Sequence, residues 1–138
     1  MNITVVGTGY VGLVTGVCFA DLGHHVTCVD KDEHKIDRLN RFDMPIYEPG
    51  LKELVEKNVK AERLTFTTVL ASGVERSEVV VIAVGTPSLP NGEADLSFVE
   101  QVATEIARHM NGYKIVMTKS TVPVGTNDKI KHIVRSLT

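Results

Sequence analysis

The sequence has little cysteine, little net charge and no long apolar run, and each shortage excludes a class of protein. Two cysteines among 138 residues do not make a disulfide scaffold, and they do not stand at a metal-ligand spacing. A formal net charge of -2 gives no electrostatic reason to expect nucleic acid or an anionic membrane as a partner. No stretch approaches the roughly 18 uninterrupted apolar residues of a membrane span. The N-terminus runs straight into a strand-like segment with no basic leader, so we expect a cytoplasmic protein.

The remaining composition is that of an ordinary globular domain, with 43% hydrophobic and 23% charged residues. Short apolar runs typical of buried parallel strands alternate with apolar residues at helical spacing. The predicted strands cover residues 3–6, 25–29, 64–67, 78–84 and 113–118, and the predicted helices cover residues 10–22, 32–39, 51–59, 69–74, 96–110 and 130–137. This alternation predicts an α/β fold of the Rossmann type, a doubly wound parallel sheet with helices on both faces.

Residues 1–138 provide five of the six strands that such a sheet usually has, so we expect one domain that is a fragment of a longer chain. The strand at 113–118 would then have an open edge, flanked by Lys114 and Lys119, which only partly discourage pairing with another chain. The sequence therefore predicts a modestly stable fragment that is prone to association.

The predicted first helix contains four apolar residues at helical spacing, and these are expected to mark its buried face: Val14, Val17, Cys18 and Leu22. Cys28 lies in the middle of the predicted second strand. We interpret both cysteines as small core hydrophobes. The histidines have no zinc spacing, so no metal site is predicted.

A glycine-rich run, Gly7-Thr8-Gly9-Tyr10-Val11-Gly12, joins the first strand to the first helix and matches G-x-G-x-x-G. The pattern alone is weak, but its strand–turn–helix context is the one in which it binds dinucleotides. Gly7 permits the tight turn, Gly9 lets the backbone approach a pyrophosphate, and Gly12 lets the helix pack closely on the strand. The helix N-terminus then offers unpaired N–H groups to the phosphates.

An acidic residue, Asp30, directly follows the second strand, where its carboxylate can accept hydrogen bonds from the adenine ribose hydroxyls. A 2′-phosphate about 4 Å from it would meet repulsion of about 4 kcal/mol per charge pair at an effective dielectric of about 20. We therefore expect NAD rather than NADP as the cofactor. Lys31 and Lys35 lie nearby and soften this repulsion without replacing the lost ribose bonds. A glycine-rich turn serving FAD or S-adenosylmethionine remains the alternative.

Two threonines follow later strands at their carboxyl ends, the rim of an open α/β sheet where ligands bind. Thr86 follows the fourth predicted strand and Thr121 follows the fifth. Each hydroxyl can bond a cofactor ribose, phosphate or carboxamide, and each can equally cap a turn or a helix. The residues alone leave these alternatives open.

Four separated motifs, in the same order along the chain, resemble those of the UDP-glucose/GDP-mannose dehydrogenase family. They are Gly7-Thr8-Gly9-Tyr10-Val11-Gly12-Leu13, Pro45-Ile46-Tyr47-Glu48-Pro49-Gly50-Leu51, Val84-Gly85-Thr86-Pro87 and Ser120-Thr121-Val122-Pro123-Val124-Gly125-Thr126. The resemblance covers the whole chain and implies contacts to NAD from the residues that match Val11, Asp30, Lys35, Thr86 and Thr121. Together with Gly7, Gly9, Tyr10 and Gly12 these residues form the predicted cofactor site.

The resemblance also implies a reaction, in which the family oxidises the C6 alcohol of a nucleotide sugar to a carboxylate with two NAD through a thiohemiacetal on a catalytic cysteine. Neither Cys18 nor Cys28 matches that nucleophile, which lies in the family's later domains. We therefore expect NAD binding without turnover, no catalytic residue in this chain, and a UDP-sugar partner only in a full-length homo-oligomeric parent. By resemblance the loops favour UDP-glucose, with GDP-mannose or UDP-N-acetyl-mannosamine as alternatives and a stand-alone NAD-sensing module as a rival from another class.

Overall fold

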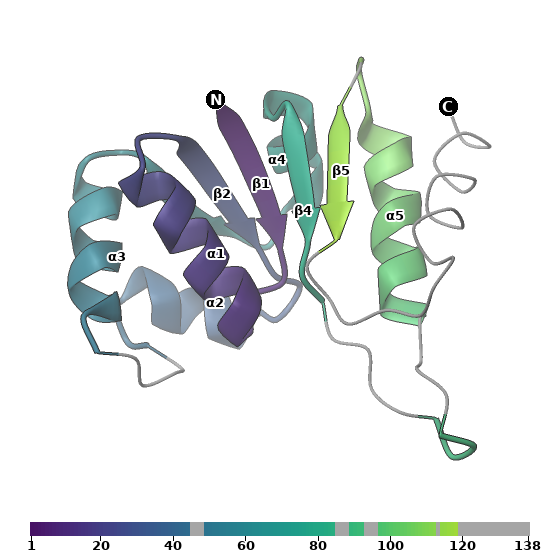
Figure 1. The fold of residues 1–138 in the computed structure, drawn as a ribbon, viewed down its shortest axis with the longest axis horizontal. Coiled ribbons are helices and arrows are strands. Elements are labelled where there is room, and N and C mark those ends of the chain that lie inside the picture. The colour runs from purple at the N-terminus through teal and green to yellow at the C-terminus, as the bar shows by residue number, and fades with distance from the viewer. Residues whose placement is uncertain (45–48, 85–88, 93–96, 113, 119–138) are drawn as a thin grey trace.

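The computed structural model describes residues 1–44, 49–84, 89–92, 97–112 and 114–118, and in it five parallel strands form one sheet in the order β3-β2-β1-β4-β5 (Figure 1). The strands are β1 (Asn2–Val6), β2 (His25–Val29), β3 (Leu64–Thr67), β4 (Val79–Ile82) and β5 (Ile115–Thr118). The helices are α1 (Tyr10–Asp21), α2 (Glu33–Asn40), α3 (Leu51–Lys60), α4 (Leu70–Arg76) and α5 (Ser97–His109). The predicted doubly wound α/β fold is confirmed, while the predicted helix at 130–137 lies outside the described residues.

The sheet separates two hydrophobic cores, and the central strands supply residues to each in turn. In β1, Ile3 and Val5 belong to the core under α1, α2 and α3, whereas Val6 belongs to the core under α4 and α5. In β4, Val79 and Val81 belong to the core under α1, α2 and α3, and Val80 and Ile82 belong to the core under α4 and α5. This two-residue alternation is why both strands are apolar along their whole length. The chain reverses its winding direction between β1 and β4, which places a ligand-binding crevice at their carboxyl ends.

Helix α1 packs on the sheet through a different face from the one expected. Its buried residues are Gly12, Leu13, Gly16, Val17 and Ala20. Only Val17 of the four predicted core positions is fully buried, whereas Leu22 is 75% exposed and Cys18 is exposed. The interpretation of Cys18 as a core residue is therefore wrong.

The physical reason is that α1 is apolar on nearly every side, so its periodicity does not indicate which side faces the sheet. The face that packs on the sheet is set instead by how closely the helix backbone can approach the strands. A Cβ at Gly16 would lie 2.7 Å from Cys28 Sγ, a contact that only a glycine avoids. The buried face of α1 therefore includes small residues spaced four apart, Gly12, Gly16 and Ala20, whereas Val14 is only half-buried and Cys18 is exposed.

Helix α2 begins as its sequence predicts. The Asp32 carboxylate accepts hydrogen bonds from the backbone N–H of His34 at 3.0 Å and of Lys35 at 3.3 Å. Asp32 is thus an N-cap in addition to placing negative charge at the positive end of the helix dipole. This cap fixes the start of α2, and with it the position of Lys35 beside the end of β2.

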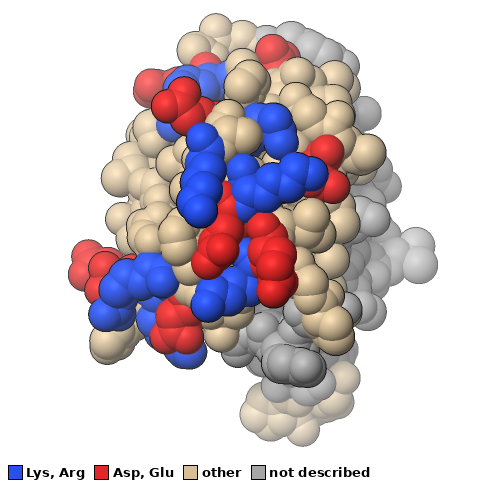
Figure 2. All heavy atoms as spheres, turned by 90° about the vertical axis from the view of Figure 1, so that its left-hand side faces the viewer, with Lys and Arg blue, Asp and Glu red and all other residues tan. Residues whose placement is uncertain are grey.

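Acidic and basic side chains are interspersed on the face that includes α2 and α3 (Figure 2). The ion pairs recorded among the described residues of these elements include Arg38–Asp43 at 3.0 Å and Lys57–Asp21 at 3.1 Å, the latter joining α3 to the end of α1. The face in view therefore carries charge of both signs without a dominant sign.

Strand β5 is the outermost strand on its side of the described sheet. Its side chains Ile115 and Met117 are 48% and 42% exposed. Lys114, one of the two lysines that flank this strand in the sequence, donates from its Nζ to the Ser77 backbone oxygen at 2.6 Å. None of the helices in the described residues is long and apolar enough to cross a membrane.

Candidate dinucleotide-binding site

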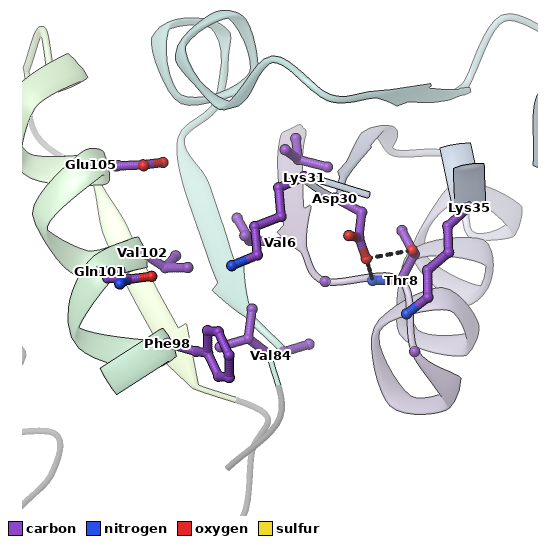
Figure 3. Close-up of a pocket in the computed structure, with 14 residues that line it drawn as sticks. Val6, Thr8, Asp30, Lys31, Lys35, Val84, Phe98, Gln101, Val102 and Glu105 are labelled. Atoms are coloured by element: carbon purple, nitrogen blue, oxygen red, sulfur yellow. Dashed lines mark hydrogen bonds between the residues drawn. The ribbon is translucent and has the colours of Figure 1, made fainter. Parts of the chain in front are cut away.

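A cavity of about 460 Å³ opens at the carboxyl ends of β1, β2 and β4, at the crevice where the winding direction reverses. Its floor is formed by residues at the strand ends, including Val6, Val29 and Ala83. One wall combines the loop after β1 with the start of α2, and the other is the face of α5 that carries Phe98 and Glu105 (Figure 3). The volume lies in the range of small-molecule and cofactor sites.

The glycine-rich loop between β1 and α1 is held tightly at its two ends and is open in its middle. Gly7 has a φ of +106°, its N–H donates to the Val29 oxygen at 2.7 Å, and a Cβ there would lie 2.7 Å from the Ala83 oxygen. A Cβ at Gly12 would lie 2.0 Å from the Gly7 oxygen. These distances support the predicted roles of Gly7 in the turn and of Gly12 in helix packing.

Gly9 differs from both, because a Cβ at this position would meet no atom of the described residues within 4 Å. Its φ of -69° is open to any residue, and its backbone forms the N-cap of α1 without a side-chain cap. The described part of the chain therefore offers no internal packing reason for a glycine at position 9. An external reason, the close approach of a ligand to the helix N-terminus, fits this open space.

Thr8 joins the glycine-rich loop to the acidic residue after β2, and the sequence prediction missed it. Its N–H donates to Asp30 Oδ2 at 3.0 Å and its hydroxyl donates to the same oxygen at 2.7 Å (Figure 3). Asp30 Oδ1 accepts a third bond, from the Asp32 N–H at 3.0 Å. Thr8 is 1% exposed, so its hydroxyl needs such an acceptor.

The Asp30 carboxyl is kept ionised by its surroundings. Partial burial opposes the charged form, but hydrogen bonds from the Asp32 amide, the Thr8 hydroxyl and the Thr8 amide outweigh it, with a smaller contribution from the charge of Lys35. The net effect lowers the pKa of Asp30 below its ordinary value. The two bonds to Oδ2 and one to Oδ1 leave Oδ1 with a lone-pair direction for a further donor.

Four residues of α5 line the cavity opposite Asp30, and sequence reasoning missed all of them: Phe98, Gln101, Val102 and Glu105. Lys31 extends from the end of β2 across the cleft, and its Nζ lies 4.6 Å from the centre of the Phe98 ring (Figure 3). Lys35 also lines the cavity, from the first turn of α2. The apolar residues at helical spacing in α5 indicate the helix face that is buried against the sheet, and they give no sign of the neighbouring face, which lines the cleft.

The other predicted cofactor residues are distributed unevenly. Gly7, Gly9, Asp30 and Lys35 line the cavity together. Gly12 lies behind the loop, and Tyr10 and Val11, 53% and 46% exposed, lie in the first turn of α1. Thr86 and Thr121 lie outside the described residues.

Neither cysteine lines the cavity. Burial raises the pKa of the Cys28 thiol to about 12, so this thiol stays protonated and unreactive. Across the described part of the chain, no three His, Cys, Asp or Glu side chains gather as a metal-binding group. The charged side chains that line the described cleft are therefore two carboxylates, Asp30 and Glu105, and two lysines, Lys31 and Lys35.

Comparison with known proteins places this cleft in a family. Residues 1–138 match the profile described as "UDP-glucose/GDP-mannose dehydrogenase family, NAD binding domain". The chain is 57% identical to the UDP-glucose 6-dehydrogenase of Rhizobium meliloti over 136 aligned residues. The aligned region covers 98% of this chain and 31% of that protein. It is 54% identical to UDP-glucose 6-dehydrogenase TuaD of Bacillus subtilis, over 97% of this chain and 29% of that protein.

The fold agrees with solved structures of the same group. A ternary complex of GDP-mannose dehydrogenase from Pseudomonas aeruginosa superposes with a TM-score of 0.94 at 38% identity, covering 99% of this chain and 32% of that one. A UDP-glucose dehydrogenase from Pyrobaculum islandicum gives a TM-score of 0.92 at 38% identity, over 97% of this chain and 32% of that one. The chain thus spans less than a third of the length of each of these four relatives, and it belongs to the UDP-glucose/GDP-mannose dehydrogenase family, whose NAD-binding domain it matches over residues 1–138.

Proposed function

We propose that this chain binds NAD as the N-terminal domain of an enzyme that oxidises UDP-glucose to UDP-glucuronate in two NAD-dependent steps. The observation that carries the proposal is the presence of an open glycine loop beside an ionised carboxylate in one cleft, at Gly9 and Asp30. The names of the most similar curated relatives support the choice of UDP-glucose.

The residues present fit the two polar parts of the cofactor. The open space at Gly9 lies at the N-terminus of α1, where the positive end of the helix dipole suits a pyrophosphate. The remaining acceptor direction on Asp30 Oδ1 suits a ribose hydroxyl, because a carboxylate held by three donors is fixed in orientation before the ligand arrives. When bound, NAD supplies the hydride acceptor. The chain's own residues bind and orient it.

Asp30 also supports a preference for NAD over NADP. A 2′-phosphate about 4 Å from the carboxylate would meet repulsion of about 4 kcal/mol per charge pair at an effective dielectric of about 20, which corresponds to about a thousandfold in affinity. The low pKa of Asp30 keeps this repulsion in place at neutral pH.

The test is calorimetric titration of NAD and NADP into the unmodified 138-residue chain and into three variants of it. Asp30→Ala removes the ribose acceptor and should weaken NAD binding by about tenfold or more. Thr8→Ala removes one bond to that acceptor while the carboxylate remains, so it should weaken binding less. Asp37→Ala on α2 is the matched control, because it removes an exposed carboxylate that does not line the cavity. If Asp30→Ala binds NAD as tightly as the unmodified chain, Asp30 does not hold the adenine ribose and the proposed binding site is wrong.

The division of labour within the parent enzyme is a second part of the proposal. The described residues provide no reactive thiol in the cleft, so the chain should bind NAD without forming NADH when UDP-glucose is added. Steady NADH production by the purified 138-residue chain would refute it. Sugar choice is assigned to the remainder of the parent, because a GDP-mannose dehydrogenase and a UDP-D-ManNAc dehydrogenase both superpose on this domain with a TM-score of 0.94.

A further inference from the structure

Lys31 is the residue next to Asp30, yet its charge lies across the cleft. The Nζ atom is 4.6 Å from the centre of the Phe98 ring, which projects from the second residue of α5 (Figure 3). An ammonium over an aromatic face is attracted by the negative charge of the ring face. The cavity retains its volume of about 460 Å³ with this contact made, since both residues line it.

The position of this ammonium matters for cofactor choice. A ribose held by Asp30 presents its 2′ position beside that carboxylate, and a lysine one residue away has a flexible four-carbon stem that can reach a phosphate there. A free Lys31 would offset part of the repulsion between Asp30 and a 2′-phosphate. A Lys31 held on Phe98 has first to leave the ring.

We propose that Phe98 is a specificity-determining residue, which strengthens the preference for NAD by holding the Lys31 ammonium on the far wall of the cleft. The inference rests on the proposed function, because it assumes that Asp30 receives the adenine ribose. The inference adds Phe98 of α5 to Asp30, which follows β2, as a second residue that affects the preference for NAD over NADP. Its magnitude is that of an exposed cation–π contact, about two- to fivefold in the ratio of NADP to NAD affinity.

The experiment measures the dissociation constants of NAD and NADP, by displacement of NADH in a calorimeter, for the parent and a set of variants at positions 31 and 98. Phe98→Leu keeps an apolar side chain and removes the aromatic face, so NADP should gain about two- to fivefold relative to NAD. Any loss of packing against the base weakens both ligands equally and cancels in the ratio. Phe98→Tyr keeps the aromatic face and should keep the parent ratio.

Lys31→Ala identifies the source of the gain. In the parent background this substitution should change the ratio by less than about twofold, because the ammonium is already held away from the 2′ position. In the Phe98→Leu background it should abolish the gain. High salt should also reduce the gain, because the freed charge acts through solvent. Phe98 is 38% exposed, so these variants are expected to fold, and a thermal melt of each checks this.

The outcomes separate the inference from the function on which it rests. A parent chain that does not bind NAD overturns both. A parent that binds NAD and prefers it, together with an unchanged ratio in Phe98→Leu, overturns only the role of Phe98. A Lys31→Ala effect that is equally large with and without Phe98 also overturns it, since the ammonium would then act independently of the ring.

Discussion

Gly9 and Gly12 stand three residues apart in one loop, and the structure predicts opposite results when each is replaced by alanine. A Cβ at position 12 would lie 2.0 Å from the Gly7 oxygen and 2.9 Å from the Gly7 carbonyl carbon, whereas a Cβ at position 9 would have no atom within 4 Å among the residues that the structure describes. One substitution should therefore damage the fold, and the other should damage only ligand binding.

The magnitude for Gly12→Ala follows from the clash. Contacts of a Cβ below 3.0 Å are essentially never seen, so the Gly7 oxygen would have to retreat by at least 1.0 Å. That oxygen is backbone in a loop whose N–H is bonded to Val29, so no side-chain rotation relieves the contact. Overpacking of this kind costs about 1–3 kcal/mol, and we expect the upper end. For a domain of this size about 3 kcal/mol corresponds to a fall of roughly 10 °C in Tm.

Gly9→Ala should leave the free energy of unfolding within about 1 kcal/mol of the parent, because the lower entropy of the unfolded chain offsets the poorer N-cap. Its NAD affinity should nevertheless fall by about tenfold or more, since the methyl group occupies the space proposed for the pyrophosphate. Urea unfolding and NAD titration of the two variants decide the matter. A stable Gly12→Ala would refute the packing reason, and undiminished NAD binding by Gly9→Ala would refute the ligand reason.

Three further predictions concern titratable and buried polar groups. Native protein at pH 8 should expose one thiol to a disulfide reagent, that of Cys18, and denatured protein two, because burial raises the pKa of Cys28 to about 12; a Cys18→Ser variant that still reacts when folded would contradict this. The lowered pKa of Asp30 contributes stability that is present above its unfolded pKa and is lost as pH falls through the folded value, so in urea titrations the margin of the parent over Asp30→Asn should shrink on acidification below about pH 4. The Thr4 and Ser77 hydroxyls bond at 2.6 Å in the core, so Thr4→Val and Ser77→Ala should each cost about 1–2 kcal/mol in unfolding experiments, and strictly additive losses in the double variant would show that the bond is not made.

The parts of the site that sequence predicts well are those set by local backbone geometry. Gly7 and Gly12 are required by contacts within one strand–turn–helix unit, and Asp30 directly follows the next strand. Such requirements leave a fixed spacing in the chain. The parallel pairing of the strands follows for a similar reason, because each apolar run is long enough to be a strand and the helices between the strands impose parallel connections.

The parts that it misses depend on contacts between distant segments. Thr8 occupies a position that the G-x-G-x-x-G pattern leaves free, and its partner Asp30 is 22 residues away. Phe98 meets Lys31 only because α5 and the end of β2 flank the same crevice. The buried face of α1 was misjudged at Cys18 because nearly uniform apolarity carries no direction, and close packing at Gly16 made the choice.

The bonds from Thr8 to Asp30 have a consequence for anyone who wishes to redesign the cofactor preference. The carboxylate proposed to discriminate against a 2′-phosphate is also the anchor of the glycine-rich loop, so the two properties would share one side chain. Replacing Asp30 by a small neutral residue would remove the repulsion and, in the same step, leave a Thr8 hydroxyl that is 1% exposed without its acceptor. A successful conversion to NADP should therefore need a paired change at position 8, and a single substitution at Asp30 should lower stability as well as change the proposed NAD preference.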